Sequence, residues 1–127
     1  MAMIKGIHHV ALKCCTKKEY EKALFFYNEI LGMPVLRQWP TGMMLDTGNG
    51  VMEIFNNGEG YLPQGVLRHV ALATDDVDGC VEKIKEHGYE VFIGPKDIVI
   101  ASDPELPARI AFCKGPLGEE IELFCEK

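Results

Sequence analysis

Two histidines and two glutamates recur at matching places in this sequence. The run His-Val-Ala-Leu that begins at His9 returns with the same letters at His69. Each copy is followed downstream by a short apolar segment with one glutamate, Glu53 in Met-Glu-Ile-Phe and Glu122 in Ile-Glu-Leu-Phe. Neutral imidazoles and carboxylates are ligands of divalent metal ions, and four such groups suffice for one site. The repeat therefore predicts one metal centre in a metalloenzyme.

The composition is that of a globular protein with one compact domain. Of the 127 residues, 47% are apolar and 25% are charged, and the net charge is -6. This charge, without a cluster of Lys and Arg, argues against a nucleic-acid partner. No signal-peptide pattern or membrane-length apolar run is visible, so we expect a cytoplasmic protein without a membrane partner. Five cysteines without a C-x-x-C pair predict reduced thiols.

The first half of the chain reads as one strand, one helix and three further strands. Period two in the strand predicted over 7–14 places His9 on one face and His8 on the other. Thr16 and Glu19 have the spacing of a capping box, and an apolar stripe at helical spacing follows as far as Gly32. The three further strands are predicted over 35–39, 43–46 and 51–56.

The same order of elements restarts after a Gly- and Pro-rich linker at 58–65. A strand over 66–74 precedes a helix capped by Asp75 or Asp76, whose apolar stripe ends before Gly88. The remaining predicted strands cover 89–93, 97–101, 108–114 and 119–125, with a turn at Gly94-Pro95 and a loop at 102–107.

The chain therefore consists of two modules, 1–60 and 66–127, of the order β-α-β-β-β. Each module is too small to bury a good core alone, so we expect them to pair into a single α+β domain over 1–127. Two curved sheets of this kind would form a half-barrel cleft in which His9, Glu53, His69 and Glu122 converge. Pairing within one chain and pairing across a dimer would both supply the same four ligands.

These features resemble the vicinal-oxygen-chelate superfamily of glyoxalase I, bleomycin-resistance and extradiol dioxygenase proteins. The resemblance includes the His-Val-Ala-Leu opening of each module, the helix end at 27–33 and the closing Gly-Glu-Glu-Ile-Glu-Leu-Phe at 118–124. It implies the paired β-α-β-β-β fold and a divalent metal on His9, Glu53, His69 and Glu122. The fourth ligand, Glu53, favours the short bacterial glyoxalase I branch, which is a homodimer that prefers nickel or cobalt. Zinc, manganese and iron remain possible metals.

By that resemblance, the substrate is the hemithioacetal of a 2-oxoaldehyde such as methylglyoxal with a thiol such as glutathione. The product is a 2-hydroxyacyl thioester, formed through a metal-bound enediolate. Glu122 is the expected catalytic base and Glu53 its counterpart, while Lys13, Arg37 and Asn57 match the positions that bind substrate. Lys13 replaces an arginine, which keeps the positive charge but lacks the forked geometry that binds a carboxylate with two hydrogen bonds.

Two other classes of function stay open on the sequence. The first is another metal enzyme of the superfamily, namely a CoA-ester epimerase, a dioxygenase or a thiol transferase. The second is a metal-free small-molecule binding or resistance protein, for which four matched ligands have no evident use. Bound metal after purification discriminates between the two classes.

Overall fold

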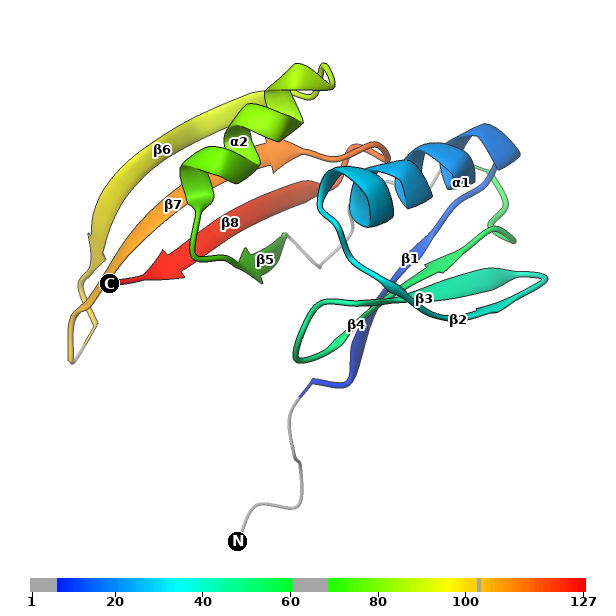
Figure 1. The fold of residues 1–127 in the computed structure, drawn as a ribbon, viewed down its shortest axis with the longest axis horizontal. Coiled ribbons are helices and arrows are strands. Elements are labelled where there is room, and N and C mark those ends of the chain that lie inside the picture. The colour runs from blue at the N-terminus through cyan, green and yellow to red at the C-terminus, as the bar shows by residue number, and fades with distance from the viewer. Residues whose placement is uncertain (1–6, 61–68, 103) are drawn as a thin grey trace, which may run out of the picture. The chain divides into compact units, whose positions relative to one another are not determined.

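The computed structural model describes residues 7–60, 69–102 and 104–127. The chain forms two compact units, Met1–Leu62 and Pro63–Lys127, and each combines one four-stranded mixed sheet with helix on one side (Figure 1). The architecture is α+β, as predicted, and neither sheet closes into a barrel. In the part of the chain that is described, no helix is long and apolar enough to cross a membrane.

The sheet of the first unit has the strand order β1-β4-β3-β2. Its strands are β1 (His9–Lys13), β2 (Val35–Trp39), β3 (Gly42–Asp46) and β4 (Val51–Phe55). β1 pairs in parallel with β4, and the other pairs are antiparallel. The predicted strands are therefore present, but β1 is shorter than the predicted strand over 7–14 and begins at His9.

The predicted first helix changes character halfway. The α-helix α1 (Lys17–Leu24) continues as the π-helix η1 (Phe25–Ile30). Thr16 caps α1 as predicted, since its hydroxyl accepts from the Glu19 amide at 3.1 Å. The Glu19 carboxylate, however, accepts from the amide of Cys15, one residue before the cap. A single wide turn changes the hydrophobic pattern too little to be read from the sequence, so the prediction of continuous α-helix was wrong.

Buried side chains of the helix and of β3 and β4 form the core of the first unit. α1 contacts β4, and Met52 and Ile54 of β4 are almost fully buried. Because side chains alternate along a strand, Glu53 points to the opposite face of the sheet. The other fully buried large side chains of this unit are Phe26, Tyr27 and Leu45. Phe26 and Tyr27, two consecutive residues, are both buried in the π-helical turn.

The second unit repeats this arrangement with the strand order β5-β8-β7-β6. Its elements are β5 (Val70–Ala73), α2 (Val77–Glu86), β6 (Val91–Ile100), β7 (Leu106–Lys114) and β8 (Glu120–Glu126). β5 is parallel to β8, and β6, β7 and β8 are antiparallel neighbours. Both sheets are thus four-stranded, with the first strand of each unit parallel to the last.

Two boundaries in the second unit differ from the prediction. The two strands predicted over 89–93 and 97–101 are one strand, β6, in which Gly94-Pro95 forms an irregularity of the register instead of a turn. Gly94 has φ +73°, which a glycine adopts without steric cost, so the ladder resumes at Lys96. The predicted loop 102–107 is also too long, because Leu106 and Pro107 already pair with β6.

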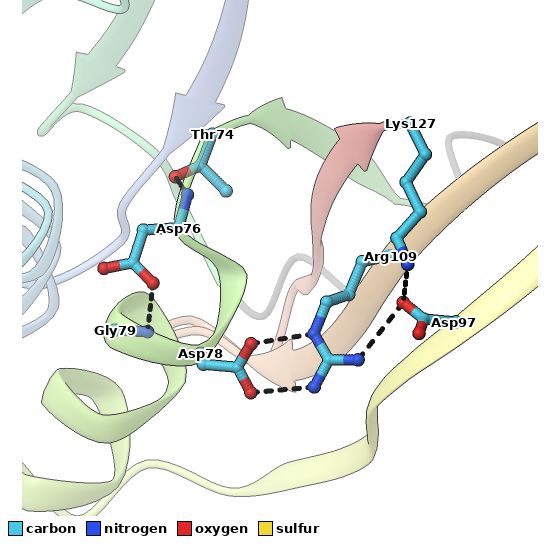
Figure 2. Close-up of polar contacts among 7 residues, drawn as sticks. All are labelled: Thr74, Asp76, Asp78, Gly79, Asp97, Arg109 and Lys127. Carbon is cyan, nitrogen blue, oxygen red and sulfur yellow. Dashed lines mark hydrogen bonds and ion pairs between the residues drawn. The ribbon is translucent and has the colours of Figure 1, made fainter.

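Helix α2 is attached to its sheet by an apolar stripe and by ion pairs. Val77, Val81 and Ile84 are buried against β6, β7 and β8, as the helical spacing predicts. Asp76 is the N-cap, with its carboxylate accepting from the Gly79 amide at 2.9 Å (Figure 2). The Arg109 guanidinium donates to both oxygens of Asp78, at 2.7 and 2.9 Å. This fork joins the first turn of α2 to β7.

Candidate metal centre

The first His–Glu pair lies on neighbouring parallel strands of the first unit. His9 opens β1, and Glu53 stands in the middle of β4 opposite Ala11. Because residues two apart on a strand share a face, His9 and Glu53 are diagonal neighbours on one face of the sheet. The His9 Nε2 lies 3.4 Å from Glu53 Oε1. The His9 side chain is 41% exposed and that of Glu53 only 10%. The imidazole is therefore accessible to solvent, whereas the carboxylate beside it is largely shielded.

The second pair repeats this geometry in the second unit. His69 directly precedes β5, and Glu122 of β8 stands opposite Ala71. The His69 Nε2 lies 3.3 Å from Glu122 Oε1, and the two side chains are 41% and 11% exposed. Distances, exposure and strand pairing therefore agree between two units that share only a few letters of sequence.

The two carboxylates are the only charged residues in the buried class among the described residues. A buried carboxylate loses hydration, which disfavours its ionised form. Burial accordingly raises the pKa of Glu122, and the neighbouring His69 acts in the opposite direction. Charged side chains are seldom buried in protein cores, so the burial of a carboxylate at the same place in both units is unusual.

Each unit supplies two of the four predicted metal ligands. Among the described residues, no group of three or more His, Cys, Asp or Glu side chains is gathered as a metal ion requires. Each pair nevertheless has atoms that suit a divalent ion, because an imidazole nitrogen lies within 3.4 Å of a carboxylate oxygen and both are metal-binding atoms. Each His–Glu pair therefore supplies half of the predicted ligands and is called a half-site below. The complete four-ligand set stays a prediction.

Two of the predicted substrate-binding residues share the sheet face of Glu53. Arg37 of β2 stands opposite Met44 of β3, which in turn stands opposite Glu53. Directly opposed residues of a sheet point to the same side, so Arg37 is about two strand spacings, roughly 10 Å, from Glu53. Lys13 ends β1 on the face of His9, with its Nζ 5.6 Å from the centre of the Phe55 ring. Both basic side chains are on exposed residues of the first unit.

Asn57, the third of these residues, follows β4 as an exposed residue without regular structure. Its neighbour Asn56 donates from Nδ2 to the Pro40 carbonyl at 2.9 Å, which holds this end of the strand. Asn57 is thus two residues beyond Phe55, near the Lys13 end of the sheet. The contact of Asn57 with substrate stays a prediction.

An aromatic wall beside His69 was not anticipated from the sequence. The Phe112 ring packs edge-on against the His69 imidazole, with ring centres 5.3 Å apart, and Phe92 lies 5.9 Å from Phe112. Phe112 stands opposite Glu122, which is the position of Met44 in the first unit. An alignment of the two modules by their strand pairing could have identified Phe112. The repeated His-Val-Ala-Leu and Glu-containing segments do not include this residue.

The expectation that His8 points away from His9 was wrong. The strand begins at His9, so the alternation of side chains does not extend to His8. The Nδ1 atoms of His8 and His9 lie 3.0 Å apart, and their rings meet edge-on at 89° with centres 5.2 Å apart. Strand periodicity failed here because it applies only within the strand, and His8 precedes β1.

Comparison with known proteins gives consistent similarities over nearly the whole chain. A family model described as "Glyoxalase/Bleomycin resistance protein/Dioxygenase superfamily" matches residues 6–123. The uncharacterized protein YaeR of Escherichia coli (strain K12) is 27% identical, with 98% of each chain covered. A protein of Synechocystis sp. named "Probable lactoylglutathione lyase" is 29% identical over 84% of this chain and 86% of the relative. Among solved structures, the antibiotic binding protein TnmS3 from Streptomyces sp. CB03234 has a TM-score of 0.74 and 25% identity, with both chains covered completely.

Proposed function

Because the chain belongs to the glyoxalase/bleomycin resistance protein/dioxygenase superfamily, we propose that it is a metal-dependent glyoxalase I-like lyase. The substrate is the hemithioacetal of methylglyoxal with a thiol such as glutathione, and the product is a 2-hydroxyacyl thioester. The observation that carries the proposal is the His–Glu contact, which recurs at 3.4 and 3.3 Å in the two units. A histidine that only completes a fold has no need to recur beside a buried carboxylate.

One divalent ion is proposed to bind His9, Glu53, His69 and Glu122. Two carboxylates balance the charge of the ion, and two imidazoles favour a first-row transition metal over magnesium or calcium. We favour nickel or cobalt on the family resemblance, with zinc, manganese and iron as alternatives. When bound, the ion supplies a positive charge that stabilises negative charge developing on the substrate oxygens.

The two glutamates are the proposed proton carriers. Glu122 removes the proton from the carbon that bears sulfur, and Glu53 is its counterpart at the neighbouring carbon. The C–H bond at the carbon that bears sulfur breaks and a new C–H bond forms at the adjacent carbon, while the hydroxyl proton passes to the former ketone oxygen. The hemithioacetal carbon thereby becomes the thioester carbonyl and the ketone becomes a hydroxyl, so the molecule is isomerised without an external oxidant. A shielded carboxylate suits this task because weak hydration makes it a stronger base.

Basic residues of the first unit are the proposed anchors for the thiol. Arg37 shares a cross-strand row with Glu53, and Lys13 shares a strand face with His9. A thiol that carries carboxylates, as glutathione does, can pair with these cations at some distance from the reacting carbons. Asn57 is proposed as a third, uncharged contact.

The test is turnover by protein that has been stripped of metal and reloaded separately with nickel, cobalt and zinc. The methylglyoxal–glutathione hemithioacetal is supplied, and thioester formation is followed by ultraviolet absorbance. We expect activity only in reloaded protein, and the rates rank the metals. Failure to bind any of the three ions would contradict the proposal. Tight metal binding without turnover would redirect the search to other thiols, CoA thioesters or catechols.

A metal-free binding protein is the second candidate, because the full-length similarity to TnmS3, an antibiotic binding protein, favours it. This alternative predicts that small-molecule affinity is unchanged by chelators. Titration of the stripped and reloaded protein with the same ligand separates the two functions, since only the lyase proposal makes binding depend on the ion.

The proposed assembly is a cytoplasmic homodimer, which rests on the family resemblance alone. Sedimentation velocity of stripped and reloaded protein tests it. We expect twice the monomer mass in the reloaded sample, whereas a monomer at micromolar concentration would contradict the proposal.

A further inference from the structure

The contact between His8 and His9 lies outside the predicted ligand set and has its own chemistry. The His8 Nδ1 is 3.0 Å from the His9 Nδ1, while the opposite nitrogen of His9, Nε2, faces Glu53 at 3.4 Å. The two nitrogens of His9 therefore have separate partners. His8 is also held in place, because its carbonyl accepts from the Val51 amide of β4 at 3.1 Å.

We propose that His8 is a positioning residue for the metal ligand His9, an inference that rests on the proposed metal centre. A hydrogen bond between two neutral imidazole nitrogens contains one proton. When the lone pair of His9 Nε2 binds a metal ion, the single ring proton of His9 sits on Nδ1. His9 then donates to His8 Nδ1, and the proton of His8 sits on its own exposed Nε2.

This arrangement gives His9 the outer support that metal-bound histidines usually have. Such histidines donate their second ring N–H to a carboxylate, a carbonyl or water, and the donation fixes the ring and raises its basicity. Here a neighbouring imidazole takes that place. The edge-on packing of the two rings, at 89°, restricts rotation of His9 as well.

Among the described residues, which do not include 61–68, the ring that packs against the other histidine, His69, is a phenylalanine. The His69 ring is packed edge-on against Phe112, a side chain without a hydrogen-bonding group, with ring centres 5.3 Å apart. Both imidazoles thus pack edge-on against a neighbouring ring, at 89° and 82°, and the ring beside His9 carries a hydrogen-bonding nitrogen.

The experiment measures affinity for zinc by competition with a chromophoric chelator, using the stripped full-length chain. His8→Phe retains a ring and removes the acceptor, whereas His8→Asn replaces it with an amide oxygen. We expect His8→Phe to bind zinc roughly 10- to 100-fold more weakly. His8→Asn should recover most of that loss. His87→Phe, which removes a histidine at the end of α2, is the matched control and should bind like the unaltered chain.

A second measurement needs no variant. Correlation spectra of the ring nitrogens in the zinc-loaded chain should show the proton of His9 on Nδ1 and that of His8 on Nε2. The opposite tautomer for His9, or a His8→Phe affinity equal to the unaltered one, would overturn the role of His8 while leaving the metal centre intact. Absence of zinc binding by the unaltered chain would instead reject the metal centre, and this inference with it.

Discussion

His69 Nε2 and Glu122 Oε1 lie 3.3 Å apart at the start of two parallel strands, β5 and β8. The same relationship holds between His9 and Glu53 in the first unit, at 3.4 Å. In each unit the histidine comes from the first strand or the residue before it, and the glutamate from the last strand. Parallel pairing of those two strands places the residues together although more than forty positions separate them in sequence.

The base assignment predicts a separation of metal binding from turnover. Glu122→Gln retains a ligand oxygen but cannot accept the substrate proton. We expect turnover to fall roughly 10²- to 10⁴-fold, as for loss of a general base, while most of the metal is retained. The measurement combines kcat with metal content. Glu126→Gln, at the exposed end of β8, is the control. Full activity of Glu122→Gln would remove the assignment.

The two histidines should contribute comparably to metal binding. His9→Ala and His69→Ala each remove one nitrogen ligand from pairs of equal geometry. We therefore expect both variants to lose more than about 100-fold in metal affinity, since ligand loss exceeds the effect of an outer partner. Chelator competition measures this, with His87→Ala as the reference. If one variant bound normally, the four-ligand set would be wrong.

Arg37 should affect substrate binding more than the chemical step. Arg37→Ala removes a cation about two strand spacings from Glu53, so the interaction is the same in the ground and transition states. Loss of one charge-assisted hydrogen bond corresponds to a roughly 10- to 100-fold rise in KM with kcat nearly unchanged. Steady-state kinetics with reloaded protein tests this. Lys18→Ala, at an exposed position of helix α1, is the control, and an unchanged KM for Arg37→Ala would exclude the proposed anchor.

The ion pairs of Arg109 should make stability depend on acid pH. Hydrogen bonds from Arg109 hold the pKa of Asp78 below its usual range, and Lys127 and Arg109 do the same for Asp97 (Figure 2). A carboxyl group with a lowered folded pKa stabilises the fold above its unfolded pKa, about 3.9 for Asp, and loses this effect as pH falls through the folded value.

Urea unfolding from pH 7 to pH 2 tests this relationship. Arg109→Gln should be less stable than the unaltered chain at neutral pH, and the difference should shrink progressively below about pH 4. Lys96→Gln, on the same strand as Asp97, should show a smaller difference with a weaker pH dependence. A stability gap for Arg109→Gln that stays constant down to pH 2 would contradict the ionic origin.

Most of the elements and the identity of the candidate ligands were determined by the sequence itself. The repeated His-Val-Ala-Leu run, the matched glutamates, the caps at Thr16 and Asp76 and the helix-ending Gly32 and Gly88 are local signals, and the structure has each of these caps and helix ends. Local signals suffice because capping and period-two alternation depend only on residues a few positions apart.

Only the tertiary structure decided what depends on contacts between distant segments. The start of β1 at His9 depends on where pairing with β4 begins, and this turned His8 from a residue of the opposite face into a neighbour of His9 Nδ1. The π-helical turn of η1 and the continuous β6 through Gly94-Pro95 are likewise features that the local sequence pattern did not indicate. Strand register places Arg37 in the row of Glu53 and Phe112 beside His69, because hydrogen bonding between strands, and not sequence spacing, sets which side chains are neighbours.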